Sequence, residues 1–318
     1  MTHTVRKPPL TSLARRRVLE LIGGTTLLAM SKKLKAADQT TAQTILKRPI
    51  PKSGEMLPVV GVGTWQTFDV GPQAPERVEL KDLLRVLVAG GGSVIDSSPM
   101  YGAAERVVGD LSAELRNRKQ LFFATKVWTS GREDGIQQME ESLRLMRTKT
   151  IDLMQVHNLL DLPTHLKTLR EWKAAGRIRY LGITHYHQGA HAELERLVTT
   201  REYDFVQFNL SLAESEAEAR LLPACADSGT AVLINRPFAH AGLFGRVRGK
   251  PPPPWAAEFD CASWAQFFLK WILAHPAVTC VIPGTRRVVH MTDNLAAGRG
   301  RLPDAATRRR MAEYLRSL

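Results

Sequence analysis

Eight short apolar or β-branched runs alternate with helical patterns from residue 59 onward, and this alternation constrains the fold more than any other feature. The predicted strands are residues 59–63, 94–97, 121–127, 152–157, 178–184, 205–209, 231–236 and 278–283. The predicted helices after them are residues 77–88, 105–115, 136–146, 165–175, 190–198, 216–226, 263–273 and 288–296. Eight strand–helix units in order favour a closed (β/α)8 TIM barrel of the α/β class over an open sheet divided between two domains.

The remaining segments suggest extensions of one barrel rather than a second domain. A chain of 318 residues accommodates a barrel of about 250 residues with additions at both ends. We expect a leader over residues 1–37 and the barrel domain over 38–318. Residues 45–57 are expected to form a hairpin that plugs the barrel floor, residues 250–254 a stiff proline loop, and residues 304–318 a closing helix.

The basic charge of the chain is concentrated in the leader. The formal net charge is +13, but residues 1–37 hold eight of the 44 basic residues and one of the 31 acidic residues. The rest of the chain has 36 basic and 30 acidic residues, a net charge of +6. Because no basic stripe interleaved with aromatic residues remains there, the sequence predicts no nucleic-acid binding.

The leader has the order of an export signal. Three arginines at 15–17 precede an apolar stretch over 18–30, and Lys32, Lys33 and Lys35 follow it. The apolar stretch is too short for a stable membrane span. With Arg15 and Arg16 as its pair, the segment resembles a twin-arginine signal, which implies export machinery as a partner and a periplasmic or exported protein. The alternative is a disordered basic tail on a cytoplasmic protein.

The cysteines and histidines do not suggest a metal site. Cys225, Cys261 and Cys280 are far apart, without a CxxC pair or a histidine pair at zinc spacing, so we interpret them as buried thiols. His185 and His187, even together with His157, do not complete a recognisable ligand set. The sequence therefore predicts no metal.

Four ionisable residues lie at or just after the carboxyl ends of consecutive predicted strands. Asp96 is near the end of the second strand, Lys126 of the third and His157 of the fourth, and Tyr101 follows Asp96 by five residues. In a β/α barrel the carboxyl ends of the strands meet around one mouth, where chemistry takes place. We expect these four side chains to lie close together.

The four residues suit reduction of a carbonyl group. A phenol with a pKa near 10 is a weak acid at neutral pH, and a neighbouring ammonium such as that of Lys126 lowers this pKa. Asp96 would hold the ammonium in place. His157 would direct a ring N–H at the substrate oxygen and stabilise its developing negative charge. Tyr101 would then be the general acid.

The sequence around these residues resembles the aldo-keto reductase family. The motifs are IDSSPMYGAAE at 95–105, ATK at 124–126 and IDLMQVH at 151–157, and the resemblance runs from about residue 57 to residue 295. It implies a barrel reductase that uses NADP(H), with Asp96, Tyr101, Lys126 and His157 as the catalytic tetrad and a small carbonyl compound as substrate.

The resemblance also implies a cofactor site and a substrate pocket. Helix N-termini and arginines bind phosphate well, so the start of the helix after the eighth strand is expected to bind the adenosine 2′-phosphate. The substrate residues would be Trp65, Trp128 and His157. The cofactor residues would be Thr64, Trp65, Asp96, Thr184, His185, Gln207, Arg236, Thr285, Arg286, Arg287, His290, Asp293 and Asn294.

Four positions depart from the family pattern. Thr184 and His185 stand where the family commonly has Ser and Asn, Asn235 where an aromatic ring often stacks on the nicotinamide, and His290 where an Arg commonly meets the 2′-phosphate. Because Arg286 and Arg287 compensate for the last departure, we predict NADP(H) in preference to NAD(H). Two other functions are compatible with the pattern: a nicotinamide-binding regulatory or accessory barrel with little turnover, and a barrel isomerase or lyase.

Overall fold

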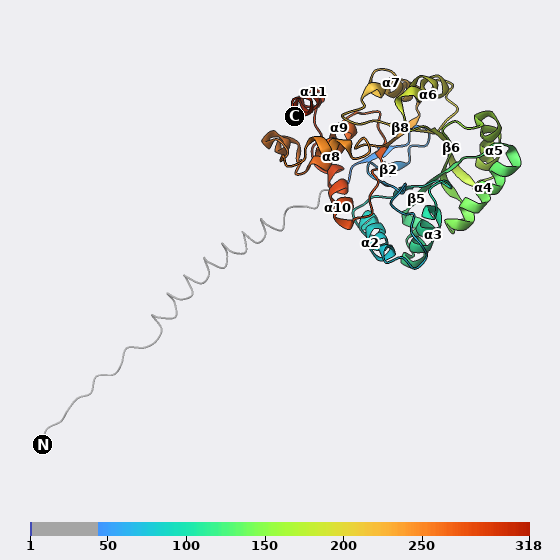
Figure 1. Ribbon diagram of the computed structural model, residues 1–318, viewed down its shortest axis with the longest axis horizontal. Coiled ribbons are helices and arrows are strands. Elements are labelled where there is room, and N and C mark those ends of the chain that lie inside the picture. The colour runs from blue at the N-terminus through green and yellow to red at the C-terminus, as the bar shows by residue number, and fades with distance from the viewer. Residues whose placement is uncertain (2–43) are drawn as a thin grey trace. The chain divides into compact units, whose positions relative to one another are not determined.

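Eight parallel strands form the centre of the molecule in a computed structural model, which describes Met1 and residues 44–318. Each strand pairs with the next along the chain, and the helices form a ring around them (Figure 1). The strands are β3 (Val62–Gly63), β4 (Val94–Asp96), β5 (Phe122–Val127), β6 (Ile151–His157), β7 (Ile178–Thr184), β8 (Phe205–Asn209), β9 (Ala231–Asn235) and β10 (Cys280–Val281). This order confirms the predicted (β/α)8 TIM barrel.

Backbone hydrogen bonds between the first and last strands close the barrel. The amide of Gly61 donates to the carbonyl of Val281 at 2.9 Å, and the amide of Val281 donates to the carbonyl of Val59 at 2.9 Å. A Cβ atom at Gly61 would lie 2.6 Å from the carbonyl oxygen of Val94. Glycine is therefore required here, because any side chain would push the first two strands apart.

The helices follow the predicted order with shifted ends. They are α2 (Glu76–Ala89), α3 (Ala104–Leu115), α4 (Arg132–Leu145), α5 (Leu162–Ala174), α6 (His191–Val198), α7 (Leu221–Ser228), α9 (Trp264–Leu273) and α10 (Val288–Ala297). The single helix predicted over 216–226 is wrong, because a 3₁₀ turn at Glu216–Glu218 precedes α7. Short 3₁₀ turns commonly connect to α-helices in this way.

Two short helices in the connection between β9 and α9 were not predicted. These are α8 (Gly242–Arg246) and the 3₁₀ helix η4 (Pro254–Phe259), which begins at the last proline of the run at 251–254. The last helix, α11 (Ala305–Arg316), forms where a closing helix was expected, and the Asp304 side chain caps it by accepting from the amide of Thr307 at 2.7 Å. The ring of Tyr314 from α11 stacks on Trp264 with a centroid distance of 6.3 Å.

A hairpin covers the amino-terminal end of the barrel, as predicted. Strands β1 (Lys47–Pro49) and β2 (Met56–Pro58) pair antiparallel. Ile50 and Leu57 from this hairpin are buried in one cluster with apolar side chains of the barrel interior. These side chains fill the floor of the barrel.

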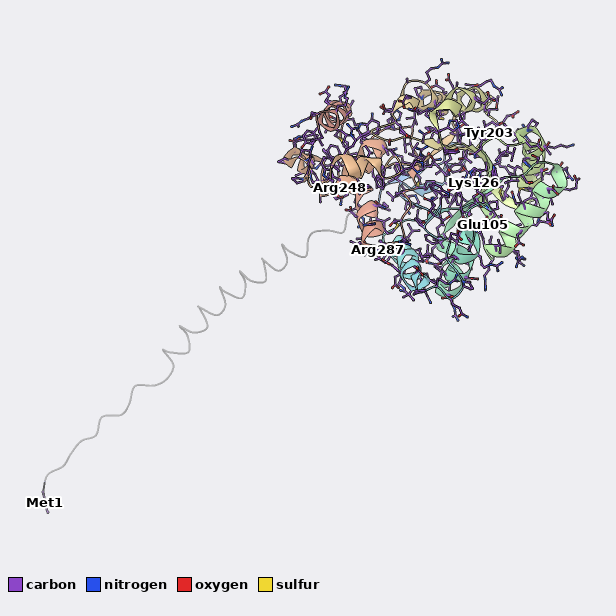
Figure 2. All side chains as sticks on the ribbon, viewed as in Figure 1. Met1, Glu105, Lys126, Tyr203, Arg248 and Arg287 are labelled. Atoms are coloured by element: carbon purple, nitrogen blue, oxygen red, sulfur yellow. The ribbon has the colours of Figure 1, made fainter. Side chains whose placement is uncertain are left out.

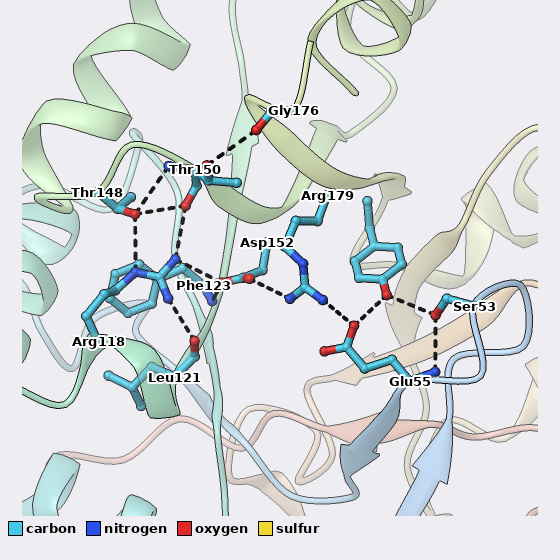
Figure 3. A network of polar contacts seen from close by, with 11 residues as sticks. Ser53, Glu55, Arg118, Leu121, Phe123, Thr148, Thr150, Asp152, Gly176 and Arg179 are labelled. Carbon is cyan, nitrogen blue, oxygen red and sulfur yellow. Dashed lines mark hydrogen bonds and ion pairs between the residues drawn. The ribbon is translucent and has the colours of Figure 1, made fainter. Parts of the chain in front are cut away.

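Next to the hairpin, a network of charged groups spans the same end of the barrel (Figure 3). The carboxylate of Asp152 accepts hydrogen bonds from Arg118 at 3.0 Å and from Arg179 at 2.8 Å. Arg179 also pairs with Glu55, which accepts from the Tyr180 hydroxyl at 2.6 Å. Each of the two carboxylates thus has an arginine partner.

The predicted export signal and the predicted start of the barrel domain at residue 38 lie outside the described residues. Residues 44–318 form one compact unit. No helix in this part of the chain is long and apolar enough to cross a membrane.

Candidate active site

The structure brings the four predicted catalytic residues together at the carboxyl ends of the strands. Asp96 is the last residue of β4, Lys126 the fifth of six in β5 and His157 the last of β6, and Tyr101 lies in the turn before α3. Figure 2 shows Lys126 inside the ring of helices. Alternation along the parallel strands directs Asp96 and Lys126 to the barrel interior, where their side chains meet.

Lys126 is held between a carboxylate and a backbone carbonyl. Its Nζ atom donates to Asp96 Oδ2 at 2.7 Å and to the carbonyl of Ser97 at 2.6 Å, and its side chain is fully buried. Burial lowers the pKa of Lys126, but Asp96 and Tyr101 outweigh that effect and raise the pKa above its ordinary value. Lys126 is therefore a permanent ammonium at neutral pH.

Tyr101 lies beside this ammonium. The Lys126 Nζ atom is 5.0 Å from the centroid of the Tyr101 ring. Burial raises the pKa of Tyr101 above its ordinary value, and Lys126 opposes that rise without overcoming it. The expectation of a lowered pKa was therefore wrong, because burial destabilises the phenolate more than the ammonium stabilises it. Tyr101 is a neutral phenol at neutral pH and has a proton to give.

His157 completes the group as a neutral imidazole. Its ring is edge-on to Tyr101, with centroids 6.0 Å apart, and its Nδ1 atom lies 3.1 Å from Ser98 Oγ. Burial and the nearby charge of Lys126 lower the pKa of His157 to about 3. A neutral ring carries one N–H, which suits donation to an uncharged carbonyl oxygen.

Two glutamines hold the second oxygen of Asp96. Gln155 Nε2 donates to Asp96 Oδ1 at 3.2 Å and Gln207 Nε2 at 2.8 Å. Gln207 was expected to contact the cofactor, and in the structure its side-chain amide donates to Asp96. Gln155 was not singled out from the sequence, although a glutamine between Met154 and Val156, two residues before His157, was a signal that could have found it.

The residues expected near the nicotinamide form one connected set around the ends of β7, β8 and β9. Thr184 Oγ1 donates to Gln207 Oε1 at 3.0 Å, and Asn235 Nδ2 donates to the carbonyl of His185 at 3.0 Å. Burial and neighbouring histidines lower the pKa of His185 to about 4. Arg236 has a left-handed backbone conformation (φ 50°) and donates to the carbonyl of Tyr186 at 2.7 Å.

Thr64 lies on the other side of the barrel mouth and is fully buried. Its hydroxyl is 3.0 Å from both the carbonyl of Asp96 and Ser97 Oγ, so Thr64 ties the end of β3 to the end of β4. Its neighbour Trp65 is 44% exposed, and its ring centroid lies 5.6 Å from that of His240. His240 comes from the loop after β9 and was not identified from the sequence.

Trp128, the second predicted substrate residue, lies at the end of β5. Its side chain is 40% exposed, and its ring centroid is 6.1 Å from that of His157. The rings of Tyr101, Trp128 and His157 thus lie around the same part of the mouth. A small carbonyl compound held there would meet aromatic walls and the groups able to donate to its oxygen.

The residues expected to hold the adenosine phosphate lie at the start of α10. Thr285 is buried, and its Oγ1 atom accepts from the amide of Arg287 at 3.1 Å and lies 3.5 Å from His290 Nδ1. Arg286 and Arg287 are exposed, and Figure 2 shows Arg287 near the edge of the ring of helices. Glu79 of α2, which was not singled out from the sequence, pairs with Arg287 at 3.0 Å.

Asp293 and Asn294, expected near the adenine, lie within α10. Both oxygens of Asp293 accept hydrogen bonds at 2.7 Å from the first turn of α9, one from Ser263 Oγ and one from Gln266 Nε2. Asn294 is buried. Asp293 therefore joins α9 to α10, a structural contact that the sequence did not reveal.

The comparison with known families decides the class of protein. A model described as the aldo/keto reductase family matches residues 59–310. The chain belongs to this family. Membership confirms the resemblance and the predicted class of enzyme, a nicotinamide-dependent oxidoreductase.

Individual aldo/keto reductases are similar over most of this chain. Methylglyoxal reductase YeaE of Escherichia coli K12 is 29% identical over 259 residues, which is 79% of this chain and 89% of that protein. Aldo-keto reductase YhdN of Bacillus subtilis is 26% identical over 59% of this chain and 60% of its own length. A crystal structure of an aldo/keto reductase from Klebsiella pneumoniae in complex with NADP and acetate is 25% identical, with a TM-score of 0.71, over 85% of this chain and 95% of that one.

Proposed function

We propose that this aldo/keto reductase reduces a small aldehyde or ketone to an alcohol with NADPH, and that Tyr101 gives the proton to the carbonyl oxygen. One observation carries the proposal: the Tyr101 ring lies 5.0 Å from an ammonium that Asp96 holds at 2.7 Å, and edge-on to a neutral His157. A general acid, a fixed positive charge and a neutral N–H donor are what a carbonyl oxygen needs as it becomes negative.

The residues at the start of α10 fit a phosphorylated nucleotide. Arg286, Arg287 and the first amides of α10 would hold the 2′-phosphate, because cationic side chains and the amides at a helix N-terminus both favour an anion. The Klebsiella reductase that contains NADP supports the same cofactor for this chain. When bound, the cofactor supplies the hydride that adds to the carbonyl carbon.

The residues of this chain manage the charge on the oxygen. His157 donates its N–H to the carbonyl oxygen and orients it. Tyr101 would transfer its phenolic proton to that oxygen. Lys126 stabilises the phenolate left behind, and Asp96 with its two glutamine partners keeps the ammonium in position.

Absorbance assays with a panel of aldehydes and ketones, methylglyoxal included, test this proposal. Tyr101→Phe is expected to lower kcat about 10²- to 10⁴-fold while the Kd for NADPH, measured by fluorescence titration, stays nearly unchanged. Tyr180→Phe is the matched control and is expected to keep full activity. Tight NADPH binding without turnover across the panel would favour the accessory barrel, and an active Tyr101→Phe protein would exclude Tyr101 as the acid.

We also infer that residues 1–37 act as an export signal of the twin-arginine type. The support is in the sequence alone: adjacent Arg15 and Arg16, an apolar stretch and basic residues after it. Replacing both arginines with lysine is expected to retain the protein in the cytoplasm of a bacterial host, as measured by cell fractionation. Unchanged fractionation of this variant would contradict the inference.

A further inference from the structure

A serine next to the proposed catalytic group contacts the ring of His157. Ser98 is fully buried and follows the last residue of β4 by two positions. Its Oγ atom lies 3.1 Å from His157 Nδ1, although the two residues are 59 positions apart in the sequence. The same Oγ atom accepts a hydrogen bond from the amide of Met100 at 3.4 Å.

These contacts determine which atom donates. A hydroxyl has one hydrogen and two lone pairs, and the Met100 amide uses one lone pair. If His157 Nδ1 carried the ring hydrogen, Ser98 Oγ would accept twice and its own hydrogen would need a third partner. Within residues 44–318, Ser98 Oγ has no other hydrogen-bond partner. The arrangement that satisfies the buried hydroxyl has Ser98 donating to an unprotonated Nδ1.

The position of the single ring hydrogen of His157 follows from its neutral state. Burial and Lys126 lower the pKa of His157 to about 3, so the ring is neutral at neutral pH and carries one hydrogen. If Nδ1 accepts from Ser98, that hydrogen is on Nε2. In the described part of the chain, Nε2 makes no hydrogen bond, so its N–H remains available for a ligand.

We propose that Ser98 is a positioning residue that fixes His157 in the tautomer with hydrogen on Nε2, the nitrogen that donates to the carbonyl oxygen. The inference rests on the proposed reduction for its consequence, but the tautomer itself is a property of the protein alone. Ser98 also restrains rotation of the ring, since Nδ1 is tied to the segment that carries Tyr101.

Nitrogen-15 NMR of protein labelled at histidine tests the tautomer directly. The His157 signals are assigned by their loss in His157→Asn. In the wild type we expect an unprotonated Nδ1 and a protonated Nε2 at pH 7, with Ser98→Ala shifting the signals toward a mixture of tautomers. A wild-type His157 protonated on Nδ1 would overturn the proposal.

Kinetics provide the second readout. Ser98→Ala is expected to lower kcat about tenfold, the usual effect of losing one buried hydrogen bond, and to leave the Kd for NADPH unchanged. Ser112→Ala is the matched control, because Ser112 is a buried serine on α3 whose hydroxyl bonds only to the carbonyl of Gly109 among the described residues. The control is expected to keep the wild-type kcat and His157 spectrum.

The outcomes separate the two proposals. Absence of turnover in the wild type would contradict the proposed reduction, while the spectra would still decide the tautomer. A Ser98→Ala protein with an unchanged spectrum and unchanged kcat would contradict the positioning role, while leaving the reduction intact.

Discussion

The two ends of the barrel each contain a cluster of a tyrosine, a carboxylate and a cation, but the clusters differ in what their tyrosines contact. At the amino-terminal end, the Tyr180 hydroxyl is 2.6 Å from Glu55 and 2.9 Å from Ser53. At the carboxyl end, Tyr101 faces the ammonium of Lys126 and the edge of the His157 ring. One phenol is fixed by hydrogen bonds between side chains, and the other faces a cation and the mouth.

The difference shows that residue types alone do not define an active site. Burial raises the pKa of both phenols, but the Glu55 carboxylate raises that of Tyr180 further, whereas Lys126 lowers that of Tyr101. A carboxylate opposes loss of the phenol proton, and an ammonium assists it. The cluster at the carboxyl ends therefore has the charge suited to proton donation, and the cluster beside the hairpin stabilises the fold.

Removing one charge from each cluster gives the largest expected contrast. Lys126→Met is expected to lower kcat/KM about 10²-fold or more and to destabilise the fold by about 3 kcal/mol, because it leaves Asp96 buried without its cation. Asp152→Ala is expected to cost about 2 kcal/mol of stability through loss of the Arg118 and Phe123 hydrogen bonds, with kcat/KM unchanged. Urea unfolding and steady-state kinetics measure both.

An Asp152→Ala protein with strongly reduced kcat/KM would break the division between a catalytic end and a structural end. Full activity of the Lys126→Met protein would contradict a catalytic role for the cluster at the carboxyl ends of the strands.

The pH dependence of stability sharpens the same contrast, because it depends on a histidine at the carboxyl end of the barrel. The pKa of His157 falls from 6.5 to about 3 on folding, so the unfolded chain binds the proton more tightly between these values. Stability due to the neutral ring is present above pH 6.5 and is lost as the pH falls toward 3, by at most about 1.4 kcal/mol per pH unit. Between pH 7 and pH 5, His157→Asn is expected to lose about 2 kcal/mol less than the wild type.

Urea unfolding of both proteins at the two pH values measures this difference. Equal losses in the two proteins would mean that folding does not lower the pKa of His157.

The smallest expected effect concerns the exposed ion pair of Glu79 and Arg287. Glu79 Oε1 accepts from Arg287 Nε at 3.0 Å and from the amide of Val288 at 3.4 Å, and these donors are among those proposed for the 2′-phosphate. Because the carboxylate competes with the phosphate, Glu79→Gln is expected to tighten NADPH binding about two- to fivefold, the range of an exposed ion pair, and to leave NADH binding unchanged.

Fluorescence titrations with the two nucleotides measure the ratio of their Kd values. Glu76→Gln is the matched control, because Glu76 is in the same first turn of α2 and the substitution removes the same charge. An equal shift in both variants would attribute the effect to net charge rather than to the Arg287 pair.

Much of the fold and part of the site follow from the sequence by itself. The eight alternating units predict a barrel because parallel strands require a helical crossover at each step, and the TIM barrel satisfies this with every strand paired. The carboxyl ends of all the strands of a barrel lie at the same end of the molecule. The sequence alone therefore placed Asp96, Lys126 and His157 at one mouth. The motif spacing around them was sufficient to suggest the family that the comparison then established.

Only the tertiary structure decided which side chains meet across long distances in the sequence. Ser98 with His157, Glu79 with Arg287 and Gln207 with Asp96 are contacts between separate units, and each depends on the side-chain direction in both units. The same holds for the pKa of Tyr101, whose direction is set by burial against the nearby charge of Lys126. Sequence patterns report the period of an element and the end of a strand, whereas contacts and desolvation depend on how whole elements pack.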